Sequence, residues 1–294
     1  MNPGILRIKM AEYIADPAPE PSLSAGIANI LVTRSSTHAW HAHPRLNPDY
    51  RPENSSIMDA GSVAHSVLLA GDEREIVVIA ADDWRTKVAK EQRDLAWSTG
   101  AIPVLERKMD AIRRMCEIAR AYLAQSEVAG IFERSEAELT FLWEENGTWF
   151  RSRPDITSHD RTIFLDYKST AASAEPFSWS RQITMMGYDM QAALALRGLR
   201  ALDPKPGRET HFIFLTQENE PPYACSLIGV PPSMLDLAER RLDFAITIWK
   251  NCMAKKQWLG YSNRICWAEP QPWQEAQFEE RQSLEEQLEI AGQA

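Results

Sequence analysis

The sequence lacks several features that would each point to a definite class of protein. No apolar run approaches the roughly 20 residues that span a membrane, and the start, MNPGILRIKMAEY, lacks the apolar core of a secretory signal. Cys116, Cys225, Cys252 and Cys266 show no C-x-x-C spacing, so neither a zinc site nor a disulfide framework is indicated. No G-x-x-x-x-G-K-[ST] phosphate loop occurs. We therefore expect a cytoplasmic protein with no membrane span and no nucleotide-driven motor of its own.

The chain also carries little positive charge. With 32 Lys and Arg residues against 41 Asp and Glu residues, its formal net charge is -9, which argues against a nucleic-acid partner. The acids are unevenly spread, however, because residues 269–294 hold seven of them and a single arginine. Residues 1–268 therefore carry only -3, which leaves room for a basic groove. The acidic end is expected to form an exposed helix that contacts another subunit or a partner protein.

Periodicity and composition predict one large α/β core with a loop-rich beginning. Residues 14–56 are rich in Pro, Ser and Asn, and from Ala137 the apolar period changes from helical to strand-like. Helices are expected at 27–32, 58–71, 84–97, 104–125, 180–200 and 232–257, and strands at 75–80, 138–145, 148–156, 162–169, 211–217 and 223–230. The result is a mixed central sheet flanked by helices. Its expected parts are an integrated helical and loop-rich part (1–130), the core (131–268) and an acidic helix (269–294).

The stretch WFRSRPDITSHDRTIFLDYKST, residues 149–170, places charged residues in runs that otherwise predict strands. Residues two apart in a strand point to the same face, so Asp166 and Lys168 project together. Asp155 ends the preceding strand, and it comes beside Asp166 if the strands pair as a hairpin. Glu138, which opens the strand 138–145, supplies a third carboxylate. Close carboxylates repel, and an all-oxygen cluster of this kind suits a shared Mg²⁺ or Mn²⁺ ion rather than zinc.

These neighbouring carboxylates indicate a chemical role for Lys168. An ammonium group near a metal-bound water can orient the nucleophile, assist its deprotonation or stabilise charge that builds on a phosphoryl oxygen. Together, the carboxylates and the lysine suit hydrolysis of a phosphodiester. A D-x-K pattern alone is common and usually marks the solvated edge of a sheet, so the neighbouring motifs decide its interpretation.

Four separated motifs occur in an order that resembles a known superfamily. The RPD of residues 153–155, an apolar strand and DYK at 166–168 resemble the PD-(D/E)XK nucleases. GYDMQAALAL resembles the Q-x-x-x-Y-type helix of RecB-like and RecE-like exonucleases, although here Tyr188 precedes Gln191. GSVAHSVLL is similar to their histidine-bearing helix, with His65 as the matching residue. SLSAGIANILVTRSSTHAWHAHPRLNP completes a likeness to the exodeoxyribonuclease VIII type, the RecE-like nuclease often found in prophages.

The resemblance implies a fold, a reaction and a set of site residues. It implies a restriction-endonuclease-like core that uses Mg²⁺, with Mn²⁺ able to substitute. It further implies 5′ to 3′ exonuclease action on linear double-stranded DNA, leaving 3′ overhangs for a single-strand annealing protein in recombination. The subunits would form a homo-oligomeric ring, a trimer or tetramer, around the duplex. The implied catalytic residues are Glu138, Asp155, Asp166, Lys168 and His65. The implied metal ligands are Glu138, Asp155, Asp166, the backbone carbonyl of Tyr167 and, as an alternative to an ordinary interior histidine, His65.

Residues expected to contact DNA come from three parts of the chain. Arg151 and Arg153 share a strand face with Asp155 and could reach phosphates, or could pair with Glu144 or Glu145 across the hairpin. Arg34, Ser35 and Ser36 are expected to hold a terminal 5′-phosphate. Tyr188 and Gln191, spaced three apart on one helix face, are expected to contact DNA or the catalytic lysine.

Other functions remain open at this stage. A second enzyme class is a different nuclease on the same core, either an endonuclease or a CRISPR-adaptation nuclease. Relatives of the latter type often hold an iron-sulfur cluster on clustered cysteines, whereas the cysteines here are scattered. A third class is a catalytically silent DNA-binding protein that retains only the fold, against which the intact Asp-Asp-Lys set argues.

Overall fold

A computed structural model describes residues 1–51, 60–70, 76–99, 101–205 and 207–292 of the chain. The chain divides into two compact units, Met1–Leu259 and Gly260–Ala294. The first unit contains all the strands of the described part, and the second contains the acidic helix α10 (Pro272–Gly292). No helix of the described residues is long and apolar enough to cross a membrane.

A five-stranded mixed sheet forms the centre of the first unit, as the sequence predicted. Strands β8 and β9 run parallel, and the other neighbours in the sheet run antiparallel. A parallel pair needs a crossover connection, which the helices α7 and α8 provide between β8 and β9. In order across the sheet the strands are β10 (Cys225–Gly229), β9 (His211–Glu218), β8 (Ile163–Thr170), β7 (Ile156–Ser158) and β4 (Ser135–Ala137).

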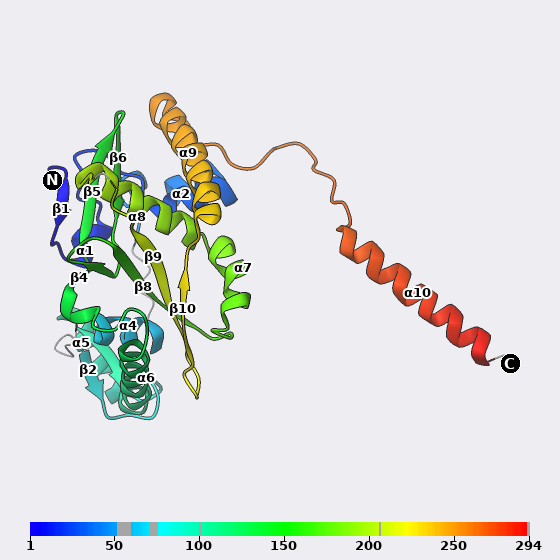
Figure 1. Cartoon of the computed structure of the whole chain (residues 1–294), viewed down its shortest axis with the longest axis horizontal. Coiled ribbons are helices and arrows are strands. Elements are labelled where there is room, and N and C mark those ends of the chain that lie inside the picture. Colours follow the sequence, from blue (N-terminus) through cyan, green and yellow to red (C-terminus); the bar gives the residue numbers. More distant parts are fainter. Residues whose placement is uncertain (52–59, 71–75, 100, 206, 293–294) are drawn as a thin grey trace. The chain divides into compact units, whose positions relative to one another are not determined.

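Helices cover both faces of this sheet (Figure 1). Alternate side chains of a strand point to opposite faces, and the two central strands are apolar on both. Phe164, Phe212 and Phe214 belong to one buried cluster, together with residues of α2 (Ala25–Thr33), α8 (Tyr188–Leu202) and α9 (Pro232–Lys255). Leu165 and Leu215 belong to a second cluster with α4 (Ala60–Ala70) and α6 (Glu106–Ala124). The chain therefore has an α/β/α layered core, which confirms the predicted fold class.

The strands predicted at 138–145, 148–156 and 162–169 are divided between two sheets, which corrects the expectation of a single central sheet. Strands β5 (Thr140–Glu145) and β6 (Thr148–Ser152) form a hairpin that pairs with β1 (Gly4–Leu6) in a separate sheet. The run 148–156 breaks after Ser152, and its last part continues as β7 in the central sheet. Pro154 lies at the break, and a proline cannot donate a hydrogen bond to a strand ladder.

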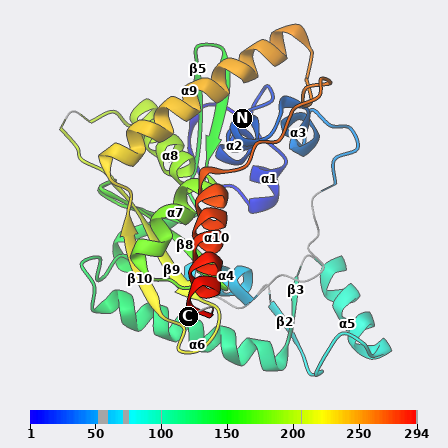
Figure 2. The same cartoon turned by 90° about the vertical axis from the view of Figure 1, so that its right-hand side faces the viewer.

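The remaining elements refine the predicted helices. Gly187 divides the helix expected at 180–200 into α7 (Pro176–Met186) and α8, and the predicted end of α4 at Gly71 lies outside the described residues. A strand that the sequence did not predict, β3 (Ile102–Leu105), pairs in parallel with β2 (Ile76–Ile79) beside α5 (Lys87–Ser98), as Figure 2 shows. Further short helices are α1 (Met10–Ile14), α3 (Ser36–Ala42) and the 3-10 helix Phe132–Arg134.

A buried polar cluster fastens the N-terminal segment to the β5–β6 hairpin. Asp16 accepts hydrogen bonds from the amide and hydroxyl of Ser22 at 2.8 and 2.6 Å, and Arg151 Nη1 donates to the Ser22 carbonyl at 2.8 Å. His43 Nδ1 accepts from the Arg45 amide at 3.2 Å, which leaves the proton on Nε2, 3.1 Å from the Ser22 carbonyl. The cluster therefore requires a neutral imidazole.

Acidification should destabilise the fold through His43. Burial, helped by the charges of Arg151 and Arg45, lowers the pKa of His43 to about 4, although the Ser22 carbonyl and Asp16 act to raise it. The unfolded chain protonates this ring near its usual pKa of about 6.5. The stabilisation is therefore complete above that pH and is lost as the pH falls toward 4, by up to about 3 kcal/mol. Urea unfolding from pH 7 to pH 4.5 measures this loss.

A variant isolates this contribution from the titration of other groups. His43→Gln keeps a donor but cannot gain a proton, so its free energy of unfolding should depend less steeply on pH than that of the wild type. His211→Gln is the matched control, because the His211 side chain is 60% exposed. Parallel curves for wild type and His43→Gln would show that His43 does not cause the loss.

Candidate active site

The pairing of β7 with β8 brings two aspartates together. Ile156 lies opposite Leu165 and Thr157 opposite Phe164, so the same antiparallel register leads from Asp155 to Asp166. The Tyr167 amide donates to Asp155 Oδ2 at 2.7 Å, which holds the Asp155 carboxylate against β8. The Asp166 side chain is fully buried. The carboxylates therefore meet at the point where β7 begins.

Lys168 lies on the same face of β8 as Asp166, toward α8. Its ammonium group forms an ion pair with Asp166 Oδ1. Its Nζ also lies 4.8 Å from the centre of the Tyr188 ring and 5.9 Å from that of Phe214. A cation over aromatic faces is stabilised by the ring quadrupoles. Lys168 is thus held between a carboxylate and an aromatic surface.

The first turn of α8 supplies that surface and a further contact. Gln191 Nε2 donates to Asp166 Oδ2 at 2.5 Å. The Tyr188 ring stacks on Trp179 of α7, with centroids 6.0 Å apart and planes 10° from parallel. Tyr188 and Gln191 thus contact Lys168 and Asp166, respectively. Tyr188 thus has the contact with Lys168 that the sequence suggested, whereas contacts of Tyr188 and Gln191 with DNA stay a prediction.

His65 reaches the acids from the opposite side of the sheet. It lies on α4, and its Nε2 is 2.9 Å from Asp155 Oδ1. Its hydrogen bond to Asp155 raises the pKa of His65 against the effect of burial, which lowers it. Asp155 is therefore bounded by His65, the Tyr167 amide and the neighbouring Asp166.

The pKa values of the two aspartates are shifted in opposite directions from that of a free aspartate. Burial and the negative charge of Asp155 raise the pKa of Asp166 to about 6, although Lys168 and His65 act to lower it. Burial would also raise the pKa of Asp155, but the hydrogen bond from His65, the nearby positive charges and the Tyr167 amide lower it overall. The pKa of Lys168 is raised by Asp166 and Asp155, which outweigh its burial. The site thus concentrates negative charge where water is largely excluded.

Glu138 lies next to this cluster, and Arg153 donates a hydrogen bond to its carboxylate. It sits between β4 and β5 with a left-handed φ of 55°, and its amide donates to the Asp155 carbonyl at 2.7 Å. Its Oε2 accepts from Arg153 Nη2 at 3.0 Å. The sequence placed Glu138 at the start of a strand, and the structure places it in the bend between two sheets. Glu136, two residues earlier in β4, pairs with Arg7 and Arg161.

The side chains of Arg151 and Arg153 bind partners in the interior of the protein. The Arg151 side chain is buried beside Asp16, and Arg153 donates to the Ile8 carbonyl, Thr140 and Glu138. Neither arginine pairs with Glu144 or Glu145 in the described structure. The pairing of β6 with β5 places Arg151 opposite Leu142. These positions support neither phosphate contacts nor the cross-hairpin pairs that the sequence suggested.

The residues predicted to hold a 5′-phosphate differ in their availability. Ser35 caps α3 by accepting from the His38 amide, and the Ser36 hydroxyl donates to the Leu259 carbonyl at 2.9 Å. Arg34 is exposed at the end of α2. The two hydroxyl groups are thus used in folding, while the guanidinium group faces solvent. A role for Arg34 in binding phosphate stays a prediction.

The donor set suits a hard divalent cation. Asp155 and Asp166 offer carboxylate oxygens in a buried setting, where burial and then the negative charge of Asp155 raise the pKa of Asp166. Among the described residues, no three His, Cys, Asp or Glu side chains gather closely enough to hold a metal ion by themselves. The two aspartates would therefore need further oxygen ligands, for which the Tyr167 carbonyl and Glu138 stay predictions.

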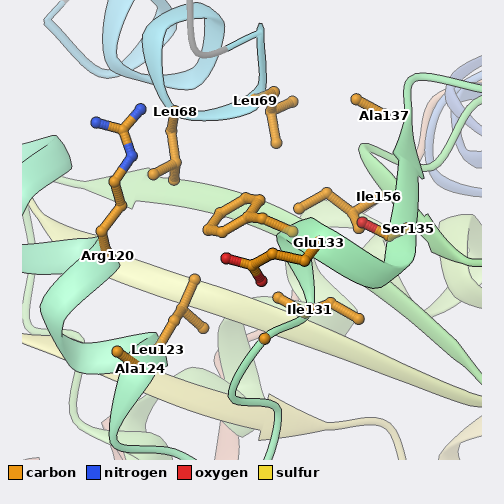
Figure 3. Close-up of a pocket in the computed structure, with 12 residues that line it drawn as sticks. Leu68, Leu69, Arg120, Leu123, Ala124, Ile131, Glu133, Ser135, Ala137 and Ile156 are labelled. Atoms are coloured by element: carbon orange, nitrogen blue, oxygen red, sulfur yellow. The ribbon is translucent and has the colours of Figure 1, made fainter.

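A pocket of about 530 Å³ lies on the α4–α6 side of the sheet (Figure 3). Leu68, Leu123 and Ile156 contribute apolar walls, and Arg120 and Glu133 contribute charges. Neither the aspartates nor Lys168 line it. The pocket is therefore separate from the acid cluster.

Sequence reasoning missed the supports of the site. Arg241 of α9 forms an ion pair with the buried Asp189 and donates to Asn29 Oδ1 at 3.2 Å, which fixes the start of α8. Trp179 and Phe214 complete the aromatic surface below Lys168. No local spacing links these residues to DYK. The tyrosine–glutamine pair in α8 was the one signal that pointed toward them.

Gly187→Ala should disturb this support strongly. Gly187 has a φ of 74°, which costs an L-residue about 1–2 kcal/mol, and an added Cβ would lie 2.4 Å from Asn29 Cγ. Asn29 would have to move and weaken its bond to Arg241. We expect the free energy of unfolding to fall by more than about 2 kcal/mol, measured by urea denaturation.

Gly147→Ala is the matched control. Gly147 has a similar φ of 78°, but nothing lies within 4 Å of an added Cβ. This variant should show the backbone cost alone. Equal losses of stability in the two variants would mean that the contact with Asn29 adds nothing.

Comparison with known proteins identifies the type of domain. A family model described as a PDDEXK-like domain of unknown function (DUF3799) matches residues 34–268. A search of the curated proteins found no match. Among solved structures, a candidate exonuclease from Eubacterium rectale aligns with a TM-score of 0.56 and 12% identity, covering 90% of this chain and 97% of that protein. At this identity the likeness shows a shared fold alone.

A second solved structure is more distant. An alkaline exonuclease from Laribacter hongkongensis aligns with a TM-score of 0.24 and 14% identity, covering 65% of this chain and 98% of that protein. This score is too low to carry an argument about the present chain. The family match and the Eubacterium structure together establish a PDDEXK-like nuclease fold.

Proposed function

The chain belongs to the PDDEXK-like domain family DUF3799, and we propose that it is a metal-dependent exonuclease that acts on the ends of linear double-stranded DNA. The observation that carries this proposal is the meeting of Asp155, Asp166 and Lys168 at one end of β7 and β8. Two carboxylates and one ammonium group are the parts that hydrolysis of a phosphodiester needs.

The aspartates would hold the cation. PDDEXK nucleases generally use divalent metal ions, and oxygen-only ligation favours Mg²⁺, with Mn²⁺ as a substitute. When bound, the ion would neutralise phosphoryl charge and favour ionisation of the attacking water. The Tyr167 amide and Gln191 would keep the two carboxylates oriented, since each donates to one of them.

Lys168 would act on the substrate rather than on the cation. Its ammonium group can donate to a phosphoryl oxygen and stabilise the charge that develops there. Its contacts with Asp166 and Tyr188 limit the positions that Nζ can adopt, so little reorganisation is needed during reaction. His65 would orient Asp155 through their hydrogen bond, or join the cation's ligands as an alternative.

The finer proposal is a RecE-like enzyme of recombination. The motif order in the sequence supports 5′ to 3′ digestion that leaves 3′ overhangs for a single-strand annealing protein. The Eubacterium rectale protein with the same fold is described as a candidate exonuclease, which favours action at ends. A homo-oligomeric ring of three or four subunits would keep such an enzyme on its duplex between cuts. Arg34 is the exposed group proposed to bind the 5′-phosphate.

One digestion experiment separates the nuclease classes. Linear and covalently closed circular forms of the same plasmid are incubated with the protein and Mg²⁺, with EDTA as control. We expect the linear form to disappear progressively and the circle to remain intact. Nicking or linearisation of the circle would replace the exonuclease proposal by an endonuclease. DNA binding without any cleavage would favour the catalytically silent alternative.

The iron-sulfur alternative receives no support from the cysteines. Cys116 and Cys252 are buried and Cys266 is exposed, and no group of three metal-binding side chains occurs among the described residues. A CRISPR-adaptation nuclease of the iron-sulfur type would require such a group.

A further inference from the structure

Helix α7 presents apolar side chains on two opposite faces. Trp179 and Ile183 are buried against the core. Phe177 and Met185, on the opposite side, are 87% and 62% exposed. A surface helix normally places polar residues opposite its buried stripe, so two large exposed apolar side chains there depart from the usual pattern. Something outside the described structure should therefore contact this face.

Arg181 lies between these two residues. Phe177, Arg181 and Met185 are spaced by four residues, so they follow one another along one face, which we call the α7 stripe. Arg181 is exposed and makes no hydrogen bond or ion pair with any residue that the structure describes. No acidic residue occurs from Pro176 to Met186. The stripe thus combines an aromatic ring, a thioether and one unpaired positive charge.

The back of the same helix is part of the catalytic support. α7 follows β8, the strand that carries Asp166 and Lys168, and its Trp179 stacks on the ring of Tyr188. Lys168 Nζ lies 4.8 Å from the centroid of the same Tyr188 ring. A molecule held by the α7 stripe would therefore contact the outer face of the helix whose inner face supports the proposed site of phosphodiester cleavage.

We propose that the α7 stripe binds the end of a DNA duplex, with Phe177 and Met185 against the terminal bases and Arg181 on a backbone phosphate. This inference rests on the proposed nuclease function and extends it to how an end is recognised. The flat faces of bases can stack on an aromatic ring. The negatively charged phosphates can pair with the guanidinium group of Arg181. An end is the place where a duplex exposes a base face.

Charge favours DNA over a second copy of the chain as the occupant. Covering Arg181 with protein would bury a guanidinium group that needs a carboxylate partner, because an unpaired buried charge is strongly unfavourable. The stripe itself has no acid to offer in a symmetric contact, in which the same patch meets itself. A nucleic-acid end satisfies both the apolar residues and the arginine.

Fluorescence of 2-aminopurine tests the contact directly. The probe is placed at the terminal or at a central position of a duplex, in the Lys168→Ala background with Mg²⁺ so that binding proceeds without rapid cutting. Binding should change the emission of the terminal probe and leave the central probe unaffected. Adding Phe177→Ala should remove the terminal change and weaken binding by about five- to 150-fold, the range for one base–aromatic stack.

Two matched substitutions serve as controls. Phe244→Ala removes an equivalent ring, 58% exposed, from α9, and Met186→Ala removes a methionine, 56% exposed, that lies off the stripe. Both should keep the terminal signal. An unchanged signal in Phe177→Ala would overturn the proposal. A change from oligomer to monomer in light scattering would also overturn it, because the stripe would then contact another copy.

Cleavage and salt dependence give independent readouts. Phe177→Ala with Lys168 intact should digest linear duplex DNA more slowly than the wild type, whereas Met186→Ala should digest it at the wild-type rate. Arg181→Gln should reduce the slope of log affinity against log salt by about 1, the effect of losing one phosphate contact. An unchanged slope would contradict the phosphate contact. Absence of DNA binding and cleavage by the wild type would instead remove the proposed function itself.

Discussion

Lys168→Ala should slow digestion of linear duplex DNA by about 10²- to 10³-fold while metal binding is retained. The loss reflects one electrostatic contact with the developing phosphoryl charge, because the ammonium group contacts Asp166 but is not itself an oxygen ligand. Initial rates with Mg²⁺ and calorimetric titration with Mn²⁺ should be measured on the same preparation. The ratio of rates gives the contribution of Lys168 directly.

Lys205→Ala controls for the loss of a positive charge. The Lys205 side chain is 61% exposed, so this variant should digest DNA at the wild-type rate. A Lys168→Ala protein that still digests DNA near the normal rate would contradict the assignment of this site. Loss of Mn²⁺ binding in that variant would show that Lys168 mainly preserves the arrangement of the carboxylates.

Asp166→Asn should abolish both metal binding and cleavage. An amide offers the cation one neutral oxygen in place of a carboxylate, and hard divalent ions depend on carboxylate charge. Without the ion, neither the attacking water nor the phosphate is activated. Calorimetry should therefore show no Mn²⁺ binding, and digestion should fall to background.

Thermal unfolding provides a second measure of the same change. A ligand that binds only the folded state raises the melting temperature, so Mn²⁺ should stabilise the wild type and leave Asp166→Asn unaffected. Asp236→Asn, at an exposed position of α9, is the matched control and should behave like the wild type. Equal stabilisation of Asp166→Asn would place the metal elsewhere.

The part of the site that depends on local register could be predicted from the sequence. The period-two pattern placed Asp166 and Lys168 on one face of a strand, and both do contact α8. The expected proximity of Asp155 and Asp166 is also found, because β7 and β8 pair in the necessary register. Their catalytic roles stay predictions, for which the Lys168 and Asp166 variants are the test.

The surroundings of these residues could not be predicted from spacing. Pro154 ends one strand and leads into another sheet, yet a proline alone does not say which strand the chain will pair with next. The environment of Glu138 depends on a left-handed backbone and on Arg153, which the run 138–145 gives no sign of. The ring beneath Lys168 belongs to a helix, and its position depends on the turn at Gly187.

The parallel pairing of β8 and β9 has a consequence for how the protein is made. Lys168 lies opposite Thr216, so the strand that carries Asp166 and Lys168 gains this neighbour only after α7 and α8 have been synthesised and folded back. Contacts between distant parts of a chain form slowly because a long loop must close first. A nascent chain that stops before β9 contains every proposed catalytic residue but lacks the framework that aligns them. An incomplete chain should therefore lack the proposed nuclease activity.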